Sequence, residues 1–107
     1  MMKAWAIQKP LVGLYQGPSR DEGSWKTVIE DFSLQGAIKT VSMYIDSVDG
    51  KNADWSYFRD GDISGLFCSY NKIGKLKVEW RSCYRIISRE LSEEYIRELE
   101  KYTCQPR

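Results

Sequence analysis

The residues best suited to chemistry are five aspartates that crowd one stretch of the chain, residues 46–62. They are Asp46, Asp49, Asp54, Asp60 and Asp62. Two carboxylates held close together can act as general acid and general base, or hold a divalent cation. Their spacing does not match the twelve-residue calcium loop, which needs Asp or Asn at alternate positions and a closing Glu. Because turns select Asp beside Gly, turn formation explains these residues better than catalysis does.

Other catalytic arrangements are missing from the sequence. It has no histidine, the usual general base, the commonest metal ligand and the partner of nucleophilic Ser or Cys. Gly61 and Gly65 frame a segment with neither the lysine of a phosphate loop nor the serine spacing of a nucleophile elbow. The cysteines Cys68, Cys83 and Cys104 are too scattered for a zinc or iron–sulfur cluster. We therefore expect no enzyme, no metal and no cofactor.

Cysteine usage and hydropathy predict a cytoplasmic protein. Three cysteines without a Cys-x-x-Cys pair make a disulfide framework improbable. Cys68 and Cys83 could face each other across a hairpin, but two small buried hydrophobic residues are the favoured explanation. The polar N-terminus, interrupted by Lys3, Lys9 and Pro10, does not look like a secretory signal. No later run approaches the roughly 20 apolar residues of a membrane span, so we expect no membrane partner.

The aspartate-rich stretch also contains large aromatic residues. Five Asp against Lys51 and Arg59 give residues 46–62 a balance of −3. Aromatic anchors among charges are typical of protein-binding hot spots for a basic partner. The candidate partner-binding residues are Asp54, Trp55, Tyr57, Asp60 and Asp62, with Asp46 and Asp49 beside them. The alternative is that Trp55 and Phe58 belong to the core and the aspartates only form turns.

Residues 72–89 carry the opposite charge, with six basic residues against Glu79, a balance of +5. On an alternating strand the basic residues share one face, and Trp80 and Tyr84 lie on the other. The basic residues of this candidate patch are Lys75, Lys77, Arg81 and Arg85, followed by Arg89. A nucleic-acid module places aromatic side chains among the positive charges, so this separation favours a merely solvated sheet face. Nucleic-acid binding through this basic strand remains the alternative function.

The elements that must position these residues indicate one α+β domain over residues 1–107 with an antiparallel sheet. A short helix is predicted near residues 24–33, where Ser24 is a plausible N-cap and apolar residues recur at helical spacing. A C-terminal helix is predicted near residues 92–103, with glutamates in its first turn. Residues 37–48 fit both a helical stripe and an alternating strand, and their β-branched residues favour strand.

The remaining segments predict strands. Residues 4–7 begin a strand that continues beyond Pro10, and residues 54–58 form another. The clearest unit is a hairpin of residues 63–70 and 75–87 around the connection 71–74.

This profile of a short α+β chain with an acidic aromatic segment and no catalytic set resembles bacterial immunity proteins. These neutralise nuclease toxins of contact-dependent growth inhibition and related polymorphic toxin systems. The resemblance implies a protein that binds a cognate toxin and occludes its active site, setting carboxylates against a basic nucleic-acid cleft. The resemblance concerns the profile of the whole chain, and it assigns a function to no individual residue.

Overall fold

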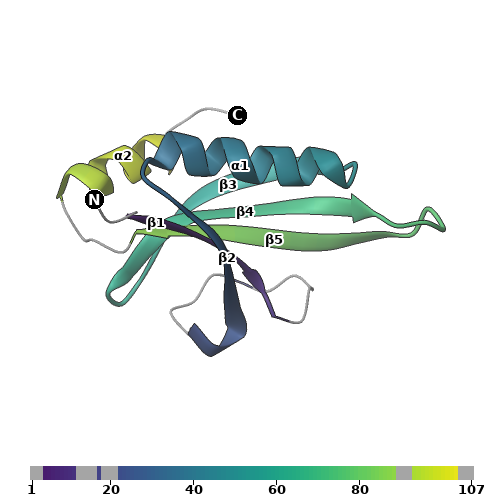
Figure 1. Ribbon diagram of the computed structural model, residues 1–107, viewed down its shortest axis with the longest axis horizontal. Helices are drawn as coiled ribbons and strands as arrows, with labels where there is room; N and C mark the ends of the chain where they lie inside the picture. The colour runs from purple at the N-terminus through teal and green to yellow at the C-terminus, as the bar shows by residue number, and fades with distance from the viewer. Residues whose placement is uncertain (1–3, 12–16, 18–21, 89–92, 104–107) are drawn as a thin grey trace.

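The computed structural model describes residues 4–11, 17, 22–88 and 93–103 and confirms an α+β fold with an antiparallel sheet (Figure 1). In chain order the elements are β1 Trp5–Pro10, η1 Glu22–Ser24, β2 Trp25–Asp31, α1 Leu34–Ser47, β3 Lys51–Asp60, β4 Ile63–Ile73, β5 Glu79–Ser88 and α2 Glu93–Thr103. The five strands are ordered β2-β1-β5-β4-β3. The N-terminal strand therefore lies between β2 and the last strand, and β2 and β3 form the two edges.

The two helices cover the same face of the sheet, with α1 over β1, β2 and β5 and α2 over β3 and β4 (Figure 1). Trp5 and Leu66 are fully buried beneath them, together with Leu34 of α1 and Leu99 of α2. The Trp5 ring packs on Tyr95 of α2, with ring centres 5.1 Å apart. A second apolar cluster, which includes Trp25, Phe58, Phe67 and Cys83, forms a separate part of the core.

Residues 34–47 form the helix α1, so the preference for a strand over residues 37–48 was wrong. The helical stripe in this segment is real, since Leu34, Ala37, Val41 and Ile45 are the residues that α1 buries. Ser33 supplies the N-cap, and its hydroxyl accepts a hydrogen bond from the Gly36 amide at 3.0 Å. Burial of one face against the sheet outweighed the β-propensity of the branched residues.

The predicted helix at residues 24–33 is also wrong, because Trp25–Asp31 is the edge strand β2. Its backbone pairs with β1 from Trp25↔Pro10 to Asp31↔Trp5. A strand beside β1 satisfies the backbone of both segments, whereas an isolated helix of this length is marginal. The C-terminal helix is confirmed as α2, with Glu93 and Glu94 in its first turn; its expected cap, Ser92, lies outside the described residues.

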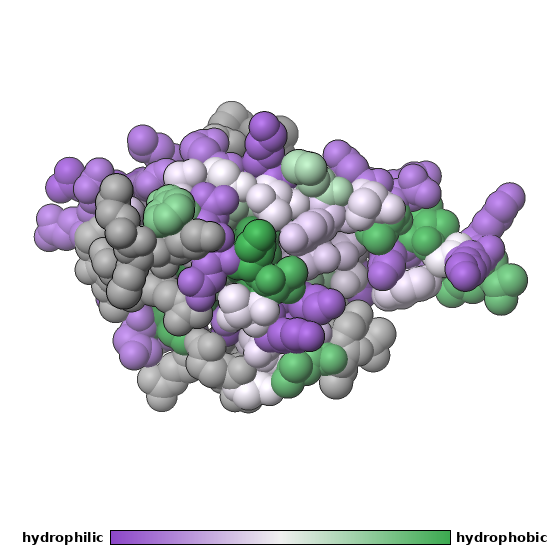
Figure 2. All heavy atoms as spheres, in the orientation of Figure 1, coloured by the Kyte–Doolittle hydropathy of each residue, from purple (hydrophilic) through white to green (hydrophobic). Residues whose placement is uncertain are grey.

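The hairpin of β4 and β5 exists, but its turn lies further along the chain than predicted. The connection is Lys75-Leu76-Lys77, closed by a hydrogen bond from the Gly74 amide to the Val78 carbonyl at 2.8 Å. Lys77 adopts a positive φ of 60°, as three-residue hairpin loops require at their last position. Leu76 and Val78 are therefore exposed, not part of an inner sheet face. The hairpin tip projects from the body of the molecule (Figures 1 and 2).

Candidate functional site

A pocket of about 180 Å³ opens where β1 separates from β5. The two strands pair only from Trp5↔Ser88 to Gln8↔Arg85. The pairing of β1 with β2 has an irregularity between Ile7 and Gln8, and β1 ends at Pro10, which has no amide proton to donate. The side chains that surround the opening belong to Lys9, Pro10, Leu11, Tyr70, Lys72, Ser82, Cys83 and Tyr84.

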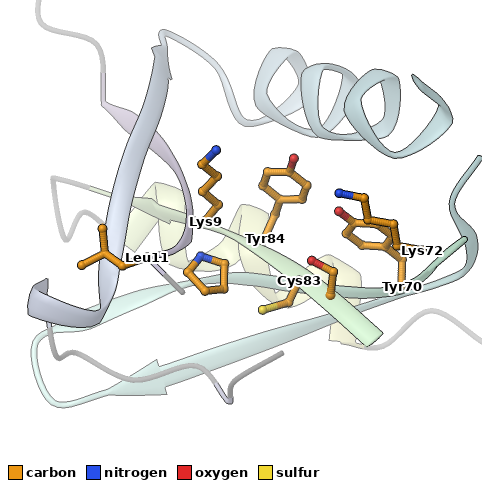
Figure 3. A pocket seen from close by; sticks show the side chains of 8 residues that line it. Lys9, Leu11, Tyr70, Lys72, Cys83 and Tyr84 are labelled. Atoms are coloured by element: carbon orange, nitrogen blue, oxygen red, sulfur yellow. The ribbon is translucent and has the colours of Figure 1, made fainter. Parts of the chain in front are cut away.

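Positive and hydrogen-bonding side chains dominate this pocket. Figure 3 shows Lys9 and Tyr84 extending on the same side of the sheet, with the Lys72 amine directed toward Tyr84 beneath a helix. The rings of Tyr70 and Tyr84 are stacked, with centres 5.9 Å apart and an angle of 9° between their planes. Tyr44 of α1 also lies against the Tyr84 ring, with the two ring centres 5.9 Å apart. This site could not be predicted from the sequence, because Lys9 and Lys72 are far apart in the chain and no local motif connects them.

Burial controls the ionisation of two groups in this region. Burial, together with the neighbouring phenols of Tyr70 and Tyr44, raises the pKa of Tyr84 from 10.0 to about 12. Tyr84 therefore stays neutral near pH 7, with a proton to donate. Burial also raises the pKa of Cys68 from 9.0 to about 12, helped by repulsion from Cys83. A thiol with so high a pKa is a poor nucleophile.

The same pKa shifts predict a loss of stability at alkaline pH. Tyr84 and Cys68 both hold their protons more tightly in the folded chain than in the unfolded chain. Their full contribution to the free energy of unfolding is therefore present at pH values below their unfolded-state pKa values. This stabilisation is lost as the pH rises from about 9 to about 12. The loss is about 1.4 kcal/mol for each unit by which the folded-state pKa exceeds the unfolded-state pKa. We expect the free energy of unfolding, measured with urea, to fall through this window, and to fall less steeply in Cys68→Ala. Equal slopes for the two proteins would contradict the role of Cys68.

The two described cysteines are free and lie in different clusters. Cys68 is opposite Tyr84 in the β4–β5 register, whereas Cys83 is opposite Ser69, so the two alternate to opposite faces of the sheet. The possibility that they face each other across the hairpin is therefore wrong. Cys68 and Cys83 are therefore simply two small buried residues.

The structure spreads the candidate acidic residues along the edge strand β3 and does not gather them in one patch. Asp46 and Asp49 lie at the end of α1 before β3 begins, and Asp60 and Asp62 lie at its other end. A ten-residue strand separates these ends by about 30 Å. Asp54 is half-buried opposite Ser69 of β4.

The aromatic members of that set have a mixed environment. Trp55 and Tyr57 lie opposite Cys68 and Leu66 and pack against the main core, yet both stay partly exposed because β3 is at the edge of the sheet. Phe58 is buried in the second cluster, so it belongs to the core as the alternative interpretation had it. Among the described residues no three Cys, Asp or Glu side chains are placed to hold a metal ion.

The candidate basic residues do not form one solvated face either, which corrects the sequence prediction. Lys75 and Lys77 belong to the hairpin turn. Arg81 donates hydrogen bonds to Asn71 and Ser69 at 2.8 and 2.7 Å. Arg85 is 0% exposed: its Nε donates to Gln8 Oε1 at 2.6 Å, and its guanidinium lies 4.4 Å from the centre of the Trp25 ring.

The separation of charges from aromatic residues is also incomplete. Lys72 and Trp80 are opposite each other in the β4–β5 register, on one face of the hairpin. The Lys72 amine lies 5.6 Å from the centre of the Trp80 ring, within the range of a cation–π contact. Part of the basic segment therefore does combine cationic and aromatic side chains.

No protein-family model, curated protein or solved structure matches the chain. Within the described part of the chain, no helix has the length and apolar character to cross a membrane.

Three apolar residues on and directly after edge strand β2 are exposed, whereas the sequence predicted them on one face of a short helix. Val28, Ile29 and Phe32 are 39%, 45% and 57% exposed. Apolar atoms are visible over β2 in the middle of the view in Figure 2. Once β2 is known to be a strand at the sheet edge, the exposure of adjacent apolar residues on it follows from the alternation of side chains.

Proposed function

We propose that this chain is a non-catalytic binding protein that recognises a basic protein partner through the acidic, aromatic edge formed by β3 and the β3–β4 turn. The observation that carries the proposal is the edge position of β3, which leaves Trp55 and Tyr57 partly exposed between carboxylates. The specific form we propose is an immunity protein that occludes the active site of a nuclease toxin in the cytoplasm. The free cysteines Cys68 and Cys83 support a reducing compartment.

The β3–β4 turn presents its carboxylates rigidly. Asp60 pairs with Ile63, so only Gly61 and Asp62 connect the two strands. Gly61 has a φ of 63°, the conformation that a two-residue hairpin turn with glycine first requires. A nuclease cleft is positively charged because it holds phosphates, so carboxylates fixed at a hairpin turn complement it. Such complementarity raises the association rate and selects the partner.

The proposal is tested with the nuclease domain of a toxin encoded directly upstream of this gene. We expect the purified chain to inhibit that nuclease at a one-to-one ratio, and its expression to restore growth of cells that carry the toxin. A nuclease that stays fully active in the presence of excess chain, or the absence of any such neighbouring toxin gene, would contradict the proposal.

A second candidate function is nucleic-acid binding by the hairpin, and the contact between Lys72 and Trp80 specifically favours it. Bases stack on aromatic rings while lysines bind phosphates. Binding of random-sequence RNA at low salt, lost steeply as salt rises, would support this function over the first. Arg85 is buried and could not contact an RNA, whereas Lys72, Lys75 and Lys77 are accessible to one.

A further inference from the structure

The pocket between β1 and β5 combines two cationic side chains from distant parts of the chain. Lys9 comes from β1 and Lys72 from β4, and both line the opening. In Figure 3 they lie on either side of Tyr84. Because both lysines line one cavity, an anion bound there would be attracted by two positive charges.

The uncharged groups of the pocket suit the same ligand. The side chains of Tyr70, Ser82 and Tyr84 add three hydroxyls to the lining, and no Asp or Glu is among the lining residues that the structure describes. The hydroxyls of Tyr70 and Tyr84 are hydrogen-bonded to each other and stay protonated near pH 7, so the pair has one further proton to donate to an anion. Hydrogen bonds that reach an ionised acceptor are stronger than neutral ones.

The size of the pocket suits one anionic group. The volume of about 180 Å³ corresponds to about six water molecules at roughly 30 Å³ each. Pockets that enclose whole drug-sized ligands begin at about 300 Å³. A single tetrahedral oxyanion with several hydrogen-bond acceptors fits this space and this set of donors.

We propose that Lys9, Lys72, Tyr70, Ser82 and Tyr84 form a binding site for one phosphate group, either free or within a phosphoester. The site lies away from the acidic edge at the β3–β4 turn and does not depend on the proposed partner. Two sources share this chemistry: inorganic phosphate or a small phosphorylated molecule, and the backbone of a nucleic acid.

The test is an NMR titration of the ¹⁵N-labelled chain with inorganic phosphate, at constant ionic strength maintained with chloride. We expect saturable shifts at the amides of Lys9, Lys72, Ser82 and Tyr84. Lys9→Met/Lys72→Met should weaken phosphate binding by about a hundredfold, since each charge-assisted contact contributes about tenfold. Tyr84→Phe, which keeps the stacked ring, should weaken it by about tenfold.

The matched control is Lys39→Met/Lys101→Met, which removes two exposed lysines of α1 and α2 and should leave phosphate binding unchanged. An oligothymidylate titration separates the sources. Saturable binding that phosphate displaces indicates a nucleic-acid backbone, and phosphate binding without it indicates a small phosphorylated ligand. Shifts that grow linearly with phosphate, or equal affinities in wild type and Lys9→Met/Lys72→Met, would overturn the proposal.

Discussion

Replacing Gly65 with alanine is expected to destabilise the fold more than any other single methyl addition that the structure suggests. Gly65 lies in β4 between Phe58 of β3 and Ile87 of β5. An added Cβ would overlap the carbonyl oxygen of Ile86 and lie 2.9 Å from its carbonyl carbon and 3.0 Å from the Ile87 Cα. These are backbone atoms of the neighbouring strand, so relief requires β4 and β5 to part and their hydrogen bonds to lengthen.

We expect Gly65→Ala to lower the free energy of unfolding by about 3 kcal/mol, at the upper end of overpacking effects. For a domain of this size that is a fall of about 15 °C in the midpoint of thermal unfolding, measured by circular dichroism. The control is the adjacent Ser64→Ala. Ser64 is 1% exposed, and its hydroxyl has no hydrogen-bond partner in the described part of the chain, so its removal should cost nothing. A Gly65→Ala midpoint equal to wild type would contradict the close approach of the strands.

The sequence predicted correctly those helices and strands that are determined by residues close together in the chain. The hairpin of β4 and β5 and the helix α2 follow from alternation, turn residues and first-turn glutamates, and both are present. The assignments that failed concern residues 24–33 and 37–48, where helical and strand patterns overlap. Ser24 and Ser33 are both acceptable N-caps, and only the pairing of β2 with β1 determines which one begins a helix.

The candidate sites depended even more on tertiary structure. The acidic residues were recognisable from composition, but their spread along β3 follows from strand geometry. The burial of Arg85 could not be inferred from charge, because it requires Gln8 and Trp25 from other strands to lie against it. The phosphate pocket depends on β1 inserting beside β5, a long-range pairing that leaves no local pattern in the sequence.

Charge reversal at the β3–β4 turn is the second large effect that we expect. Asp62 is exposed in that turn and Asp60 is partly exposed, so the proposed basic partner would lie close to both carboxylates. Asp60→Lys/Asp62→Lys replaces attraction with repulsion at two positions. Charge pairs at the rim of an interface act mainly on the association rate, and repulsive contacts cost several kcal/mol.

The matched control is Asp46→Lys/Glu79→Lys, which changes the net charge by the same amount; the sequence made Asp46 a candidate, but the structure places it at the opposite end of β3 from this turn. Both of its residues are exposed and lie on the side of the sheet toward the β4–β5 hairpin turn. Thermal unfolding of each variant verifies that it is folded. The control should bind the partner with an affinity within about threefold of wild type, because rim charges far from a contact are weakly coupled to it.

The most direct measurement of the central claim is the dissociation constant of the complex with the neighbouring nuclease toxin, determined by calorimetry at low and high salt. The proposed function predicts that Asp60→Lys/Asp62→Lys weakens binding by about a hundredfold at low salt and less at high salt, while the control stays close to wild type. Unchanged affinity and unchanged salt dependence in a folded Asp60→Lys/Asp62→Lys variant would contradict it.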